Sequence, residues 1–144
     1  MKTLFLAIFA FIFFTQAKAQ EMTKVDSTIA ILTNYLQKNT YYPAMSKENG
    51  VQGTVVISFK VDNLNITDLH IVKSLDPYCN GAVLKVFRRI NQIVLPSAEY
   101  TVGFTFVMQG EDEEPKIKRI DTSPYKNFLF DVDIIDIGYG HPKQ

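Results

Sequence analysis

The hydrophobic pattern of the chain begins with an unbroken apolar run from Leu4 to Phe14, which follows one basic residue, Lys2. Small residues come next, and Ala17-Lys18-Ala19 has the A-x-A spacing of a signal-peptide cleavage site. The apolar run is shorter than the about 20 residues needed to cross a bilayer. We therefore expect residues 1–19 to be a cleavable secretory signal. The alternative is an uncleaved N-terminus that anchors the chain in the inner membrane.

A helical period follows this run. The side chains Asp26, Ser27 and Thr28 can cap a helix, which we expect to reach about Asn39. Its apolar face is formed by Ile29, Leu32 and Leu36 and widened by Ile31 and Tyr35. A short second helix is predicted between Pro43 and Gly50, because proline favours the first helical position and glycine the position after the last.

The period then changes from helical to two, which is typical of strands with one buried face. Residues 53–61 alternate, with Val55, Ile57, Phe59 and Val61 on the apolar side. Residues 62–65 form the turn of a hairpin, since Asn and Asp tolerate left-handed backbone angles. Residues 66–74 form the second strand, with Leu69 and Ile71 inward, and residues 99–108 form a third.

Between the second and third strands, Asp76-Pro77 begins another helix, which extends to about Ile90. Its apolar side consists of Cys79, Ala82, Val83, Val86, Phe87 and Ile90, and Lys85, Arg88 and Arg89 face away. The order of elements predicts an α+β two-layer sandwich, with two N-terminal helices and then β-β-α-β around a small antiparallel sheet. Three strands leave two unpaired edges.

The composition changes after Gly110. Residues 111–115 form an acidic linker that ends in proline, and residues 127–137 are rich in strand formers but interrupted by aspartates. We interpret 127–137 as a fourth extended segment that docks on the domain and pairs with its edge, and the residues after 137 as a frayed tail. The expected organisation is a signal at 1–19, a domain at 20–110 and an extension at 111–144.

Composition and charge give little support to catalysis. The chain has 15 basic and 15 acidic side chains, and no basic stripe typical of nucleic-acid binders. The single cysteine, Cys79, is expected to be a small apolar residue of a helix. The two histidines, His70 in a strand and His141 in the tail, have no nucleophile motif near them, and Asp131, Asp133 and Asp136 lack calcium-loop spacing. We expect a solvent-exposed acidic strand face there, no metal, no cofactor, no small-molecule substrate and no enzyme activity.

The run YPAMSKENGVQGTVVISFKVD, which begins at Tyr42-Pro43, resembles the C-terminal domain of TonB in Bacteroidota-type bacteria. NITDLHIVKS, CNGAVLKVFRRI and TVGFTFVM continue the resemblance, which covers roughly residues 29–109. It implies a periplasmic domain of two helices on a small antiparallel sheet. In this family the domain binds the TonB box, an extended segment of outer-membrane transporters, by adding it to an edge strand.

The resemblance implies a docking edge along the third strand, with Tyr100, Val102, Phe104, Phe106 and Met108. Tyr42 and Pro43 match the family motif and would contact the partner. The alternative, equally supported, is that they form a turn that packs on the sheet. The implied partner is a TonB-dependent outer-membrane transporter or another envelope protein, and a homodimer stays open.

Four departures separate this chain from the family pattern. The hairpin turn has Asn63-Leu64-Asn65 instead of Asp-Gly, a tryptophan-containing stretch is missing after the third helix, and the loop before the last strand is short. The chain also shows no long proline-rich segment after the apolar run. We therefore predict a periplasmic binding module, with an anchored energy transducer as the alternative.

Overall fold

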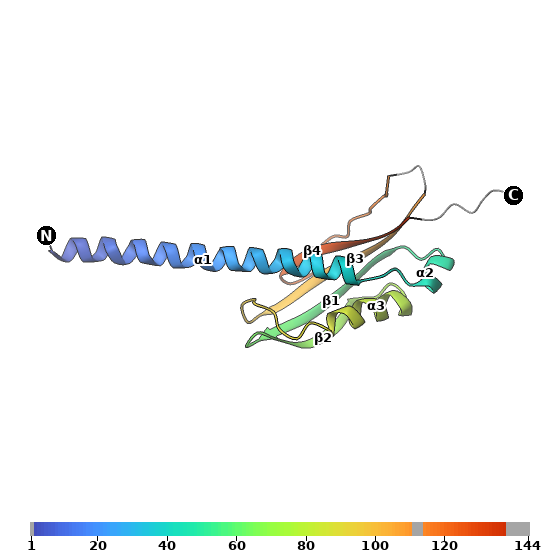
Figure 1. Cartoon of the computed structure of the whole chain (residues 1–144), viewed down its shortest axis with the longest axis horizontal. Coiled ribbons are helices and arrows are strands. Elements are labelled where there is room, and N and C mark those ends of the chain that lie inside the picture. The colour runs from blue at the N-terminus through green and yellow to red at the C-terminus, as the bar shows by residue number, and fades with distance from the viewer. Residues whose placement is uncertain (1, 111–113, 138–144) are drawn as a thin grey trace.

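The structure is a computed structural model that describes the backbone of residues 2–110 and 114–137, with side chains from Gln20 onward. His141 and the predicted tail lie outside the described residues. The described elements are α1 (Lys2–Asn39), α2 (Ala44–Glu48), β1 (Gly53–Asp62), β2 (Asn65–Lys73), α3 (Pro77–Phe87), β3 (Glu99–Gln109) and β4 (Phe128–Ile137). Figure 1 shows α1 projecting far beyond the sheet, and the other helices against one side of it.

The first helix is much longer than predicted. Neither Ser27 nor Thr28 caps it, because both hydroxyls donate back to the carbonyl of Lys24 at 2.9 Å, as they do inside a helix. Leu32 and Leu36 are buried in the core as expected, whereas Ile31 is 70% exposed, so its predicted place on the apolar face was wrong. Within the described part of the chain, no helix is long and apolar enough to cross a membrane.

The α+β fold is confirmed, and it is built around a four-stranded sheet of order β2-β1-β3-β4. β1 pairs antiparallel with both β2 and β3, from Gly53↔Phe106 to Lys60↔Glu99 on the β3 side. β4 pairs parallel with β3, so the sheet is mixed rather than purely antiparallel. The buried side chains of α3 pack with Leu36, Phe59 and Phe104 in one core on the helical side.

The opposite face of the sheet is also covered, contrary to the expected single buried face. Thr54, Val56 and Ser58 of β1 are all at most 3% exposed. The segment that joins β3 to β4 lies over this side, because residues 118–121 and Tyr125 border the same cavity as Thr54. β4 therefore reaches β3 through a crossover, and the described residues of that crossover, 114–127, contain no helix.

The predicted hairpin turn between β1 and β2 is present, with Asn63 left-handed as expected and Leu64 left-handed as well. Asn63 and Leu64 have φ values of 47° and 68°. Two positive φ angles at the centre of a two-residue loop are typical of a type I′ turn, where Asn-Gly is preferred. Leucine is strained in this region because its Cβ approaches the backbone.

Replacing Leu64 with glycine is therefore expected to stabilise the protein, by about 0.5–1 kcal/mol, because relief of this strain exceeds the added freedom of the unfolded chain. Urea unfolding of Leu64→Gly against the wild type measures this change. Leu64→Ala serves as the control, since it shortens the half-exposed side chain without relieving the backbone. Equal stability of the two variants would contradict the expectation.

Candidate functional site

The candidate docking strand, β3, contributes its side chains to the interior of the domain. Val102, Phe104 and Phe106 are fully buried in the main core, and Tyr100 is 8% exposed. Met108 lies at the end of the strand and is partly buried. What β3 can offer a partner is therefore its backbone edge rather than these side chains.

That backbone edge is occupied by β4. The two strands pair in parallel from Thr101↔Phe128 to Gln109↔Ile137, with an irregularity between Thr101 and Gly103. Val132 and Ile134, opposite Phe104 and Phe106, are 2% and 6% exposed and belong to the same core. The predicted extra segment thus pairs with the domain's own edge, as the sequence suggested.

The aspartates of β4 do not form the exposed acidic face that was predicted. The Arg119 guanidinium donates to both carboxylate oxygens of Asp133 at 2.6 and 2.8 Å and to Asp131 Oδ2 at 3.1 Å. Thr105 Oγ1 also donates to Asp131 Oδ2, at 2.7 Å, and Asp136 forms an ion pair with Lys47. The hydrogen bonds to Asp133 raise the pKa of Arg119 above its ordinary value. Each aspartate of β4 thus binds a group elsewhere in the fold.

Arg119, which pairs with two aspartates of β4, is a residue that the sequence analysis did not single out. The sequence does contain a pattern that points to a nearby cation. Residues 131–134 alternate between carboxylates and apolar residues, which lie on opposite faces of a strand. Carboxylates that are largely covered need cations or hydrogen-bond donors near them, and the basic residues Lys116, Lys118 and Arg119 precede β4 in sequence. Among the described residues no group of His, Cys, Asp or Glu is arranged to hold a metal ion.

Tyr42 and Pro43 are buried at the junction of α1, α2 and the sheet. The Tyr42 hydroxyl donates to the Val51 carbonyl, and the Tyr42 ring meets Phe106 edge-on at 5.3 Å between centroids. Pro43 is the residue before α2 and has φ −64°, which suits a helix start. Both positions match the packing interpretation of the Tyr-Pro motif.

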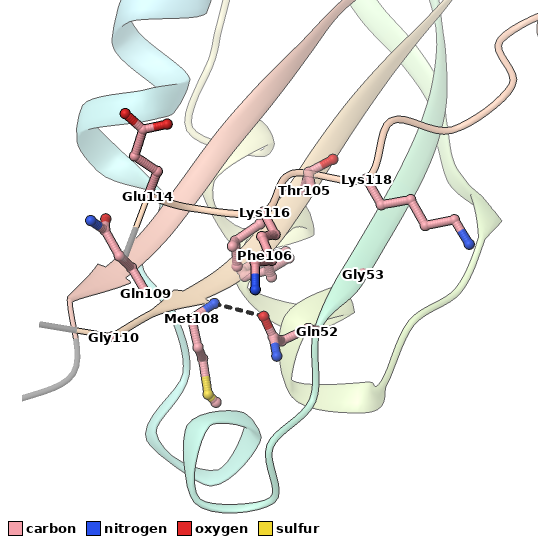
Figure 2. Close-up of a pocket in the computed structure, with 11 residues that line it drawn as sticks. Gln52, Gly53, Thr105, Phe106, Met108, Gln109, Gly110, Glu114, Lys116 and Lys118 are labelled. Atoms are coloured by element: carbon pink, nitrogen blue, oxygen red, sulfur yellow. Dashed lines mark hydrogen bonds between the residues drawn. The ribbon is translucent and has the colours of Figure 1, made fainter. Parts of the chain in front are cut away.

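A pocket lies where β3 runs past the beginning of β1 (Figure 2). Gln52 fills the missing strand position there, because its Oε1 accepts a hydrogen bond from the Met108 backbone N–H at 2.9 Å. The cavity is about 460 Å³, and Glu114, Lys116 and Lys118 border it. Met108 and Gln109 at this end of β3 are half-buried, and Gly110, the next residue, is exposed.

Cys79 is a buried structural thiol, as expected from the sequence. Burial raises its pKa from 9.0 to about 12, and burial likewise raises the pKa of Tyr42 from 10.0 to about 12. As pH rises, the unfolded chain therefore loses these protons before the folded chain does. The stability they contribute is complete below about pH 9 and is lost progressively as pH approaches about 12.

We expect the free energy of unfolding to fall between neutral pH and about pH 10.5, and to fall less in Cys79→Ala, which lacks the titrating thiol. Urea unfolding of both proteins at the two pH values measures the difference. A parallel decline in wild type and variant, or rapid labelling of Cys79 by a thiol reagent in the folded protein at pH 8, would contradict this account.

The domain is a small sheet with helices packed on one face. The backbone edge of β3 is paired with β4 of the same chain. The model of the family described as "Gram-negative bacterial TonB protein C-terminal" matches residues 38–107, from the end of α1 to near the end of β3. Residues 38–107 therefore belong to the TonB C-terminal domain family.

A solved structure, the NMR structure of the Helicobacter pylori TonB C-terminal domain, is also similar to this chain. The two share 18% sequence identity with a TM-score of 0.44, over 54% of this chain and 90% of the other. The likeness is distant, and the family assignment rests on the family model. No curated protein matches the chain. The family match makes residues 38–107 an envelope protein-interaction domain of the periplasmic type.

The family match ends at Val107, and β4 lies beyond it. In this TonB domain, then, β1–β3 with α2 and α3 form the part that the family describes. The crossover and β4 lie outside that part, and β4 covers the edge of β3.

Proposed function

We propose that this chain is an exported, periplasmic protein-interaction module that binds an extended segment of an envelope protein by strand pairing along β3. The preferred partner is a TonB-dependent outer-membrane transporter. The N-terminal segment is removed after Ala19, so that the mature chain begins at Gln20. No catalytic step is part of this function.

The observation that supports the proposal most is that the β3 edge accepts a parallel strand over most of its length. β4 pairs with it from Thr101 to Gln109 and places two apolar side chains in the core. Strand addition to an edge of this kind combines main-chain hydrogen bonds with pockets for alternate side chains. A strand from another protein can use the same positions.

Photo-crosslinking in the native host tests this function at the edge itself. A photoreactive residue at Gln109, at the end of β3, is expected to form an adduct with an outer-membrane transporter, at a site within an extended segment. The matched control is Val72, an exposed residue of β2 at the opposite edge of the sheet. No adduct from Gln109, or equal adducts from both positions, would contradict strand pairing at β3.

N-terminal sequencing of the protein recovered from the host separates the module from an anchored energy transducer. We expect the sequence to begin at Gln20. A protein that retains Met1 would favour the anchored alternative, because the apolar run from Leu4 to Phe14 would then still be present in the working protein.

A further inference from the structure

We infer that β4 is a built-in occupant of the partner site. A partner must replace it with a parallel strand of the same pattern: two apolar side chains two positions apart, alternating with carboxylates. This rests on the proposed strand pairing at β3 and adds to it the regulation of the edge and the chemistry of the partner. Three features of the described residues carry it.

The first feature is that β4 fills the edge as a separate peptide would. Its backbone pairs with β3 over the length of the strand, and Val132 and Ile134 enter the core beside Phe104 and Phe106. On the other face, Gly103 leaves room for larger side chains of β4. A Cβ at position 103 would lie 2.8 Å from Asp131 Oδ1 and 3.2 Å from Phe128 Cζ.

The second feature is a set of polar side chains that would bind the carboxylates of a partner strand. On the crossover side of the sheet, Arg119 binds both Asp131 and Asp133, and Thr105 donates to Asp131. Lys47 of α2 binds Asp136. The Arg119 side chain is 54% exposed, so it is accessible to another chain as well as to β4. An acidic strand is therefore preferred to a basic one at this edge.

The third feature is that β4 is an imperfect occupant. Asp131 Oδ1 is buried and has no hydrogen-bond partner, and burying a carboxylate oxygen without one costs free energy. β4 and its crossover also lie outside residues 38–107, which match the family. Because β4 is tethered, it nevertheless has a high effective concentration at the edge and suppresses binding of weak competitors.

β4 and a partner strand then compete for the β3 edge, and the effect on the partner's apparent affinity can be predicted. If the edge is free in only a fraction of molecules, the apparent dissociation constant of a partner is raised by the inverse of that fraction. Weakening β4 must then tighten the binding of a free peptide, and fixing β4 in place must abolish it. A merely structural fourth strand would give neither effect.

The probe is a fluorescent synthetic peptide of residues 127–137, added to the full chain. In the variant Val132→Asp, whose own β4 cannot enter the core, we expect the peptide to bind at least about tenfold more tightly than in wild type. Asp133→Asn, which weakens only the contact with Arg119, is expected to give a smaller gain of about threefold. A control peptide with aspartate at positions 132 and 134 should bind none of the proteins.

The locked form joins the strands by a disulfide between Val107→Cys and Ile135→Cys. These positions are neighbours across the β3–β4 pair, and adjacent strands lie within disulfide range. Cys79 is buried and does not interfere. The oxidised form is expected to bind no peptide, and reduction should restore wild-type binding.

Several outcomes would overturn the inference. Equal peptide binding by oxidised, reduced and wild-type protein would mean that β4 does not control the edge. Unfolding of Val132→Asp together with unchanged binding in Asp133→Asn would show that β4 is inseparable from the domain. Crosslinks between two chains in the locked variant would mean that β4 belongs to the edge of a second copy.

These outcomes are distinguishable from failure of the proposed function. If the peptide behaves as expected but Gln109 crosslinks to no envelope protein, β4 controls the edge and the proposed partner is wrong. If Gln109 crosslinks to a transporter in the native host while the locked variant still binds the peptide, the function stands and the control by β4 fails.

Discussion

Replacing Phe106 with alanine is expected to lower the free energy of unfolding by about 3–5 kcal/mol. The Phe106 side chain is fully buried, and its ring meets Tyr42 edge-on at the end of β3. Truncation removes apolar burial and leaves a cavity that the packed sheet cannot close. Urea unfolding followed by circular dichroism measures this loss.

The matched control is Val72→Ala, which shortens an exposed side chain of β2 and should change stability by less than about 0.5 kcal/mol. A cycle with Tyr42→Ala should show a coupling of about 0.5–1.5 kcal/mol between the two rings. A loss below about 1 kcal/mol for Phe106→Ala would mean that the residue is not part of the core.

The side chains of the proposed docking strand also form the core of the domain. Because Phe104 and Phe106 are core residues, their truncation weakens any binding by destabilising the domain. Such a loss is no evidence for contact with a partner. Tests of the edge therefore have to act on β4 or on the strand ends, as the crosslinker at Gln109 does.

Replacing Asp76 with alanine is expected to cost about 2–3 kcal/mol. Asp76 caps α3, since its Oδ1 accepts a hydrogen bond from the Cys79 N–H at 2.7 Å. Its Oδ2 accepts another from the hydroxyl of Ser46, a fully buried residue of α2, at 2.8 Å. The substitution removes the cap and leaves the Ser46 hydroxyl without this acceptor, and urea unfolding measures the sum.

Asp76→Asn is the matched control, because asparagine is also a good N-cap but has only one acceptor oxygen. We expect its cost to be about 1 kcal/mol. Although burial acts to raise the pKa of Asp76, hydrogen bonds from Cys79 and Ser46 outweigh it and lower this pKa below 3.8. The stability from the charged form is therefore present above pH 3.8 and is lost as pH falls further.

The difference in stability between wild type and Asp76→Asn should consequently shrink between pH 6 and about pH 3, since only the wild type has this titrating group. A difference that does not change with pH would show that the carboxylate charge contributes nothing to the cap. A difference that grows toward acid would have the wrong sign for a lowered pKa.

The sequence predicted the family part of the fold well because its patterns are local. The alternation of Val55, Ile57 and Phe59 allows a strand, and Asn63 allows the turn that follows. The helix beginning at Asp76-Pro77 was also evident, since the cap and the proline act within one turn. Such signals depend on neighbours a few residues apart.

The parts that were wrong depend on contacts between distant residues or on competition between local ones. Ser27 has the side chain of a cap, but inside a continuous helix its hydroxyl bonds back to Lys24. Asp131 and Asp133 looked exposed, because the cation that neutralises them, Arg119, reaches them only after the chain has crossed the sheet. The parallel direction of β4 likewise follows from that crossover and not from the pattern of β4 itself.

Native-state hydrogen exchange of the full chain, resolved by residue, tests most directly whether β4 closes the β3 edge and can leave it. We expect the β4 amides bonded to β3 to be protected. We expect them to open with a smaller free energy than the central amides of β1, because β4 detaches before the rest of the domain unfolds. Two results would contradict these expectations. β4 amides that exchange as fast as an unstructured peptide would mean an open edge, and β4 amides that open only together with β1 would mean a strand that no partner can displace.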